Sequence, residues 1–112
     1  MEYINRIELQ GRVGTVRTNE YNGSRVANFT LATDLLYKTH DGNVVNEITW
    51  HNIVMWEGKD TPGIDEITKG ASVYVTGRLR CNRYTNAEGV ERQFHEVMAS
   101  KVRVLKEEPI EL

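Results

Sequence analysis

Two tryptophans, Trp50 and Trp56, stand six residues apart in a stretch rich in β-branched and aromatic side chains. An even spacing puts both on the same face of a strand, because successive side chains point to opposite faces. The opposite face carries His51, Ile53 and Met55 and is also largely apolar. One core cannot cover both faces, so at least one tryptophan must face outward or into an interface. If both face outward, they form a flat platform for stacking other rings.

A second set of residues combines cations with aromatic rings. Arg78 and Arg80 alternate onto one face of a strand, Arg83 and Tyr84 follow closely, and Tyr37 ends an earlier apolar run. Single-stranded nucleic acid requires this combination, because its bases stack on aromatic faces at about 1–3 kcal/mol each and its phosphates need cations. A solvated arginine face with tyrosines packed over the core would use the same residues, and the pattern alone leaves both interpretations open.

Catalytic and metal-binding patterns are missing from the sequence. His40, His51 and His95 lie far apart and have no metal-ligand spacing, and no phosphate loop or nucleophile elbow is present. The single cysteine, Cys81, excludes an internal disulfide, and a lone strand cysteine is usually a small packing residue. We therefore expect a protein that is not an enzyme and that has no cofactor, no metal site and no catalytic residue.

Alternation of apolar and polar residues predicts strands along most of the chain. The alternating runs are 7–13, 27–33 and 73–80, and two longer runs at 44–56 and 94–105 are rich in β-branched and aromatic residues. Gly11 and Gly14 interrupt the first run, and the phase of the last run slips between Val97 and Val102. Both interruptions predict β-bulges.

Turn residues and one short helix connect these runs. The turns lie at residues 21–24, 41–43 and 86–89, the last closing a long hairpin between the fourth and fifth strands. Between the third and fourth strands, Thr61 can cap a helix of barely two turns, Pro62 suits its first position and Gly70 can end it. Five strands must protect their edges, which favours an all-β fold: a Greek-key barrel of the oligonucleotide/oligosaccharide-binding (OB) type, with the helix covering one end.

Length and composition indicate one globular domain. The chain has 112 residues, of which 39% are hydrophobic and 27% charged, and its net charge is −2. Its apolar runs are too short to span a membrane and its first residues lack a signal-peptide pattern, so we expect a cytoplasmic protein with no membrane partner. We expect residues 1–106 to form the domain and residues 107–112, with three glutamates, to form a short acidic tail.

Five segments carry a family resemblance through their order. They are NRIELQGRVG (5–14), VANFTLAT (26–33), WHNIV (50–54), KGASVYVTGRLR (69–80) and RYT (83–85), the last followed by Gly89 and Glu91-Arg92. Together they resemble the bacterial single-stranded DNA-binding protein (SSB) family over roughly residues 4–105. The resemblance implies an OB-fold protein of the nucleoid that binds single-stranded DNA without sequence preference and protects it in replication, recombination and repair.

The resemblance also implies roles for individual residues. The stacking aromatics of the family fall on Tyr37, Trp50, Trp56 and Tyr84, and its interface histidine falls on His51. It further implies a homo-oligomer, a tetramer with a dimer as the alternative. The arginines at 78, 80 and 83 are then the expected phosphate contacts.

The end of the chain departs from the family pattern and keeps a second function open. The family continues into a long flexible tail with an acidic tip that binds partner enzymes, whereas residues 107–112 follow the barrel directly. We expect them to be a short solvated terminus, with recruitment of partner enzymes as the alternative. The second function is a tail-less OB-fold interaction module, similar to the restart-primosome proteins, that acts mainly through protein partners. RNA binding also stays open, because stacking does not read the 2′-hydroxyl.

Overall fold

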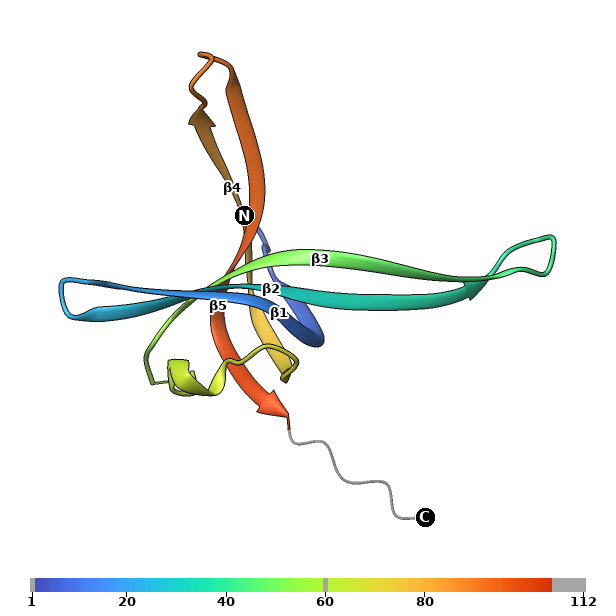
Figure 1. The fold of residues 1–112 in the computed structure, drawn as a ribbon, viewed down its shortest axis with the longest axis horizontal. Coiled ribbons are helices and arrows are strands. Elements are labelled where there is room, and N and C mark those ends of the chain that lie inside the picture. Colours follow the sequence, from blue (N-terminus) through green and yellow to red (C-terminus); the bar gives the residue numbers. More distant parts are fainter. Residues whose placement is uncertain (1, 60, 106–112) are drawn as a thin grey trace.

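The computed structural model describes residues 2–59 and 61–105, and it forms a closed barrel of five strands (Figure 1). The predicted acidic tail, residues 107–112, lies outside the described residues. The strands are β1 (Ile7–Tyr21), β2 (Ser24–Lys38), β3 (Val44–Trp56), β4 (Ser72–Thr85) and β5 (Glu91–Leu105). Around the barrel they follow the order β1-β2-β3-β5-β4. The all-β prediction and the OB-type barrel are confirmed.

β3 has the predicted bounds, whereas the other four strands are longer than their predicted runs, because the hairpins continue beyond the barrel as paired arms. The β2–β3 ladder runs from Val26 opposite Trp56 to Lys38 opposite Val44, and Figure 1 shows it extending far from the barrel. The β4–β5 hairpin forms a second arm, ending where Thr85 pairs with Glu91. The arms therefore present strand faces that no other element of the described chain covers.

The β1–β2 hairpin ends in a two-residue turn at Asn22 and Gly23, whose φ angles are 51° and 83°. An Asn-Gly pair tolerates two positive φ angles, and such a turn matches the twist of the strands it joins. The predicted bulge near Gly14 is present as a register shift between Val13 and Val16. The bulge predicted in the last strand is also present, since the pairing with β4 shifts where Ser100 is skipped.

The barrel interior holds alternate residues of all five strands. The buried apolar side chains form one cluster, with Val13, Ala27, Phe29, Leu31, Ile53, Met55, Val73, Val75, Val97 and Val102 from the strands. Ile64 and Ile67, from the connection between β3 and β4, join the same cluster. This connection therefore covers one end of the barrel, as the sequence predicts for its helix.

The predicted helix itself is reduced to a single 3-10 turn, η1 (Ile64–Glu66). Thr61 does not cap it, because its hydroxyl accepts the N–H of Gly58 at 2.8 Å. The N–H groups at the start of η1 are instead satisfied by glutamates: Gly63 donates to Glu66 at 3.0 Å, and Ile64 donates to Glu57 at 3.0 Å. Within the described residues, no helix is long and apolar enough to cross a membrane.

Candidate nucleic-acid interface

Both tryptophans of β3 lie on the outer face of the barrel. Ile53 and Met55 point into the core, and the alternate residues Trp50 and Trp56 point outward with 60% and 43% of their surface exposed. The pairing of β3 with β2 places Trp50 opposite Ala32, at the start of the β2–β3 arm. The structure thus resolves the question that the two apolar faces raised: Ile53 and Met55 belong to the core, and both tryptophans lie on the surface.

Trp50 is positioned by the glycine at the bulge of β1. A Cβ atom placed on Gly14 would lie 2.7 Å from Cζ3 of the Trp50 ring and 2.5 Å from the Thr30 hydroxyl. That hydroxyl also accepts the Thr15 N–H at 2.9 Å. Since real Cβ atoms essentially never approach so closely, the indole lies against bare backbone. The sequence marks Gly14 only as a bulge residue, and its contact with Trp50 emerges from the fold.

A groove of about 260 Å³ runs beside the tryptophans, between β1–β2–β3 and the base of the β4–β5 hairpin. Its lining is mostly polar and includes Arg17, Asn28, Thr30, Asn52, Phe94 and Glu96. The groove lies over the outer face of β2 and β3, the face with which OB folds bind oligonucleotides. Its amides, hydroxyl groups, charges and aromatic ring can contact bases and phosphates together.

Two pairs of aromatic rings lie at the β1–β2 and β4–β5 hairpins, and each contains a residue that the sequence analysis missed. Tyr21 lies 6.1 Å from Trp56, measured between ring centroids, at the β1–β2 hairpin. Phe94 lies 6.0 Å from Tyr84 in an edge-on arrangement at the β4–β5 hairpin. Tyr21 and Phe94 are both substantially exposed. The sequence signal for both residues is that they lie near predicted turns, because a hairpin brings residues after the turn beside residues before it.

The predicted arginines lie in three different surroundings. Arg80 is on the groove side, where its Nε donates to the Glu96 carboxylate at 3.0 Å and its Nη2 donates to the same oxygen. Arg83 is on the opposite face of the β4–β5 hairpin from Tyr84, since adjacent strand residues alternate, and its guanidinium is 3.9 Å from Glu91. The structure therefore does not bring the three arginines into one phosphate-binding row.

Arg78 lies away from the groove, in a hollow that Asn5 and Arg6 also line. Arg17 is the cation that sequence reasoning missed: it is exposed, it lines the groove, and no ion pair or hydrogen bond of its side chain occurs among the described residues. Its position on the outer face follows from the pairing with Asn28 across the β1–β2 ladder. No composition signal distinguishes Arg17 from the other arginines.

Tyr37 and His51 lie on the other side of the β2–β3 ladder from Trp50. Tyr37 is exposed on the arm, opposite Val45, and the alternation of β2 turns it away from the tryptophan face. His51 is half-buried, and its Nε2 lies 2.9 Å from the Thr33 hydroxyl. Partial burial lowers the pKa of His51 below its ordinary value of 6.5, because burial disfavours the charged ring.

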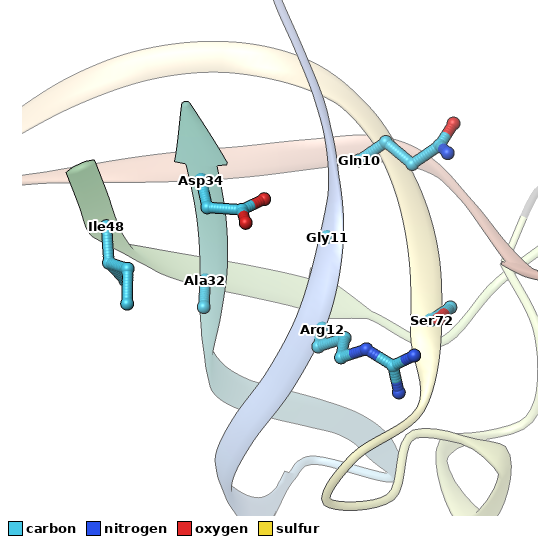
Figure 2. A pocket seen from close by; sticks show the side chains of 7 residues that line it. All are labelled: Gln10, Gly11, Arg12, Ala32, Asp34, Ile48 and Ser72. Carbon is cyan, nitrogen blue, oxygen red and sulfur yellow. The ribbon is translucent and has the colours of Figure 1, made fainter. Parts of the chain in front are cut away.

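A second hollow, of about 340 Å³, lies where β1 crosses β2 and meets β4 (Figure 2). Arg12 and Asp34 lie on different sides of it, and Arg12 donates to the Gly70 carbonyl at 3.2 Å. The hollow holds no histidine, cysteine or second carboxylate. Across the described residues, no group of three or more His, Cys, Asp or Glu side chains could hold a metal ion.

The chain is similar to known proteins over nearly its whole length. Residues 4–105 match the model of the single-strand binding protein family. Single-stranded DNA-binding proteins of Neisseria meningitidis serogroup A and Xanthomonas axonopodis pv. citri are each 31% identical over 104 residues, covering 91% of this chain and 60% and 58% of their own length. The chain thus spans about three-fifths of these relatives.

A solved structure shares the fold. The chain of the Plasmodium falciparum SSB complex with ssDNA superposes with a TM-score of 0.83 at 28% identity, covering 95% of this chain and 98% of its own. Sequence and structure thus agree on the family and on the OB-fold barrel. The chain belongs to the single-strand binding protein family.

Proposed function

We propose that this chain binds single-stranded DNA without sequence preference, by stacking bases on its outer aromatic face and by neutralising phosphates with arginines. The observation that carries the proposal is the pair of outward-facing tryptophans beside a polar groove, together with the aromatic pairs at the β1–β2 and β4–β5 hairpins. Family membership and the superposition on a protein in complex with ssDNA support it. Such binding would protect single strands in replication, recombination and repair, at the nucleoid in the cytoplasm.

The sites predicted from sequence take different parts in this proposal. Trp50 and Trp56 form the central platform, and Tyr84 extends it through Phe94. Tyr37 would contact the DNA only where the DNA passes to the other side of the β2–β3 arm. The phosphate contacts proposed at positions 78, 80 and 83 lie apart, so they would act on separate segments of DNA.

Titration of tryptophan fluorescence with oligo-thymidine, at low and high salt, tests the proposal. We expect saturable quenching and an affinity that falls as salt rises, because phosphate contacts release counterions. Trp50→Ala and Trp56→Ala should each weaken binding by about 1–3 kcal/mol, the contribution of one stacked base. Tyr3→Ala is the matched control, since Tyr3 is 88% exposed and forms no ring pair among the described residues. Normal binding by a folded Trp50→Ala variant would contradict the stacking role.

We also propose that the protein is a homo-oligomer, a tetramer or a dimer, with His51 near the interface. Large apolar side chains on the β2–β3 arm support association: Leu35, Leu36, Val44 and Ile48 are all exposed, and exposed apolar patches commonly mark interaction sites. The mass in solution separates monomer, dimer and tetramer. The same residues favour the alternative interaction module, which would gain support if the protein failed to bind single strands at low salt.

A further inference from the structure

The floor of the groove contains a carboxylate that is unusual for a surface meeting polyanions. Glu96 on β5 is only 7% exposed, yet it lines the groove together with Phe94 and Asn52. Its Oε1 accepts from Arg80 and from the Asn82 amide. All of these bonds end on Oε1, and none to Oε2 occurs among the described residues. No fully buried side-chain oxygen of the described residues lacks a hydrogen-bond partner, so Oε2 keeps some accessible surface and is the oxygen that a ligand in the groove can reach.

The chemistry of this oxygen selects what can occupy the position. A carboxylate only accepts hydrogen bonds, so a phosphate cannot partner it. The donors that single-stranded DNA carries are on its bases: the exocyclic amino groups of cytosine, adenine and guanine, and the ring N–H groups of guanine and thymine. Thymine and uracil have no amino group, and their N3–H lies between two carbonyl oxygens, whose partial negative charges repel a carboxylate. At this position the groove therefore favours a base edge over a phosphate and an amino group over a carbonyl group.

The surrounding residues orient a base for this contact. Phe94 precedes Glu96 by two residues, so both side chains lie on the same face, roughly 7 Å apart along the strand. A base stacked on the Phe94 ring would direct one edge along β5 toward the carboxylate. Arg80 and Asn82, directly opposite Glu96 and Phe94 in the β4–β5 ladder, hold the Glu96 side chain in place.

We propose that the groove is a base-edge subsite in which Glu96 accepts a hydrogen bond from an exocyclic amino group, so that the protein favours a base with such a group (cytosine, adenine or guanine) over thymine or uracil at this one position. The inference rests on the proposed binding of single-stranded DNA and refines it. It implies a bias in base composition within otherwise sequence-tolerant binding. The Asn28 and Asn52 amides also line the groove. Because an amide both donates and accepts hydrogen bonds, these two side chains discriminate less between bases.

The experiment compares short oligomers of deoxycytidine and deoxyuridine of equal length, which differ at C4, amino group against carbonyl, and at N3, which is an acceptor in cytosine and an N–H in uracil. Binding to the wild type, to Glu96→Gln and to the control Glu91→Gln is measured at one salt concentration. Glu91 lies on the same strand, and its neighbour Arg83 is on the opposite face of the hairpin. Both substitutions remove one negative charge, so the ratio of the two affinities cancels the general charge effect.

We expect the cytidine-to-uridine affinity ratio to fall about fivefold in Glu96→Gln, because a hydrogen bond to a charged acceptor exceeds a neutral one by roughly that factor. The ratio should not change in Glu91→Gln. Equal ratios in the wild type and a folded Glu96→Gln variant would overturn the subsite. Binding of both oligomers would then still support the proposed function, whereas binding of neither would remove both proposals.

A second measurement needs no variant at Glu96 and remains decisive if Glu96→Gln fails to fold. The wild type is titrated with an oligomer of N4,N4-dimethyl-deoxycytidine, whose exocyclic nitrogen has no hydrogen to donate. Its affinity should fall at least to that of the deoxyuridine oligomer. If the dimethylated oligomer binds as tightly as the deoxycytidine oligomer, the amino group makes no contact and the inference is wrong.

Discussion

Adding one methyl group beneath Trp50, in the variant Gly14→Ala, should weaken DNA binding without unfolding the barrel. The new Cβ would lie 2.7 Å from the indole, about 0.7 Å short of an ordinary 3.4 Å contact, and 2.5 Å from the Thr30 hydroxyl. Overpacking typically costs 1–3 kcal/mol of stability. Because Trp50 is 60% exposed, the ring can swing outward, and we expect the cost to be near 1 kcal/mol.

The effect on binding has an upper limit set by stacking. Complete loss of a stacked base costs about 1–3 kcal/mol, or roughly 5- to 150-fold in affinity. A tilted or displaced indole should lose part of this, so we expect a decrease of about fivefold for a short oligo-thymidine. Gly58→Ala is the matched control, because a Cβ on Gly58 meets nothing closer than 3.9 Å.

A double-mutant cycle distinguishes displacement of Trp50 from a general disturbance of β1. If Gly14 acts by positioning the indole, Gly14→Ala should have little further effect in a Trp50→Ala background. Fluorescence titration gives the affinities, and thermal unfolding shows whether each variant is folded. The reasoning is refuted if Gly14→Ala reduces affinity equally with and without the indole, or if it leaves affinity and tryptophan emission unchanged.

Three further predictions concern the face, its charge and its pH response. Tyr21→Ala and Phe94→Ala should each weaken oligo-thymidine binding by about 1–3 kcal/mol in equilibrium titrations; unchanged affinity would remove that ring from the platform. Arg17→Gln should reduce the salt slope of log affinity by about 0.7, the value for one phosphate contact of a single strand, and an unchanged slope would exclude the contact. The folded chain lowers the pKa of His51 below 6.5, so the unfolded chain binds the extra proton first and stability should decline as pH falls below 6.5. Thermal unfolding against pH should show a smaller decline in His51→Gln, and identical pH profiles would contradict this cause.

The architecture was accessible from sequence because a period of two is a local signal. Alternation located three strands and runs of β-branched and aromatic residues located the other two, and the apolar residues on both sides of Trp50 required an exposed face before any fold was known. The length of the helix was overestimated because hydrogen bonds to nearby residues replace those that a longer helix would make. Thr61 uses its hydroxyl on Gly58, and Glu57 satisfies the N–H of Ile64, so the segment needs only one turn to place its isoleucines under the barrel.

The composition of the site was less accessible, because it depends on which residues the strand register places opposite one another. Arg80 has the sequence features of a phosphate contact, but the β4–β5 register places it against Glu96. Alternation likewise places Arg83 and Tyr84 on opposite faces of the strand, but it does not show that Phe94 lies on the face away from Arg83. Gly14 shows the same limit, since its contact with Trp50 joins residues that are far apart in sequence.

The barrel closes beside the groove, where β3 pairs with β5, and this pairing is the shortest among its strands. β3 and β5 share only two parallel residue pairs, Ile53 with Val97 and Val54 with Met98. The tryptophans are on one side of this seam, whereas Phe94 and Glu96 are on the other. A DNA strand lying across the groove would therefore contact residues of both β3 and β5 and hold the two strands together. We expect amide hydrogen exchange in this region to slow on binding more than in the hairpin arms, so that the ligand also governs how often the barrel opens.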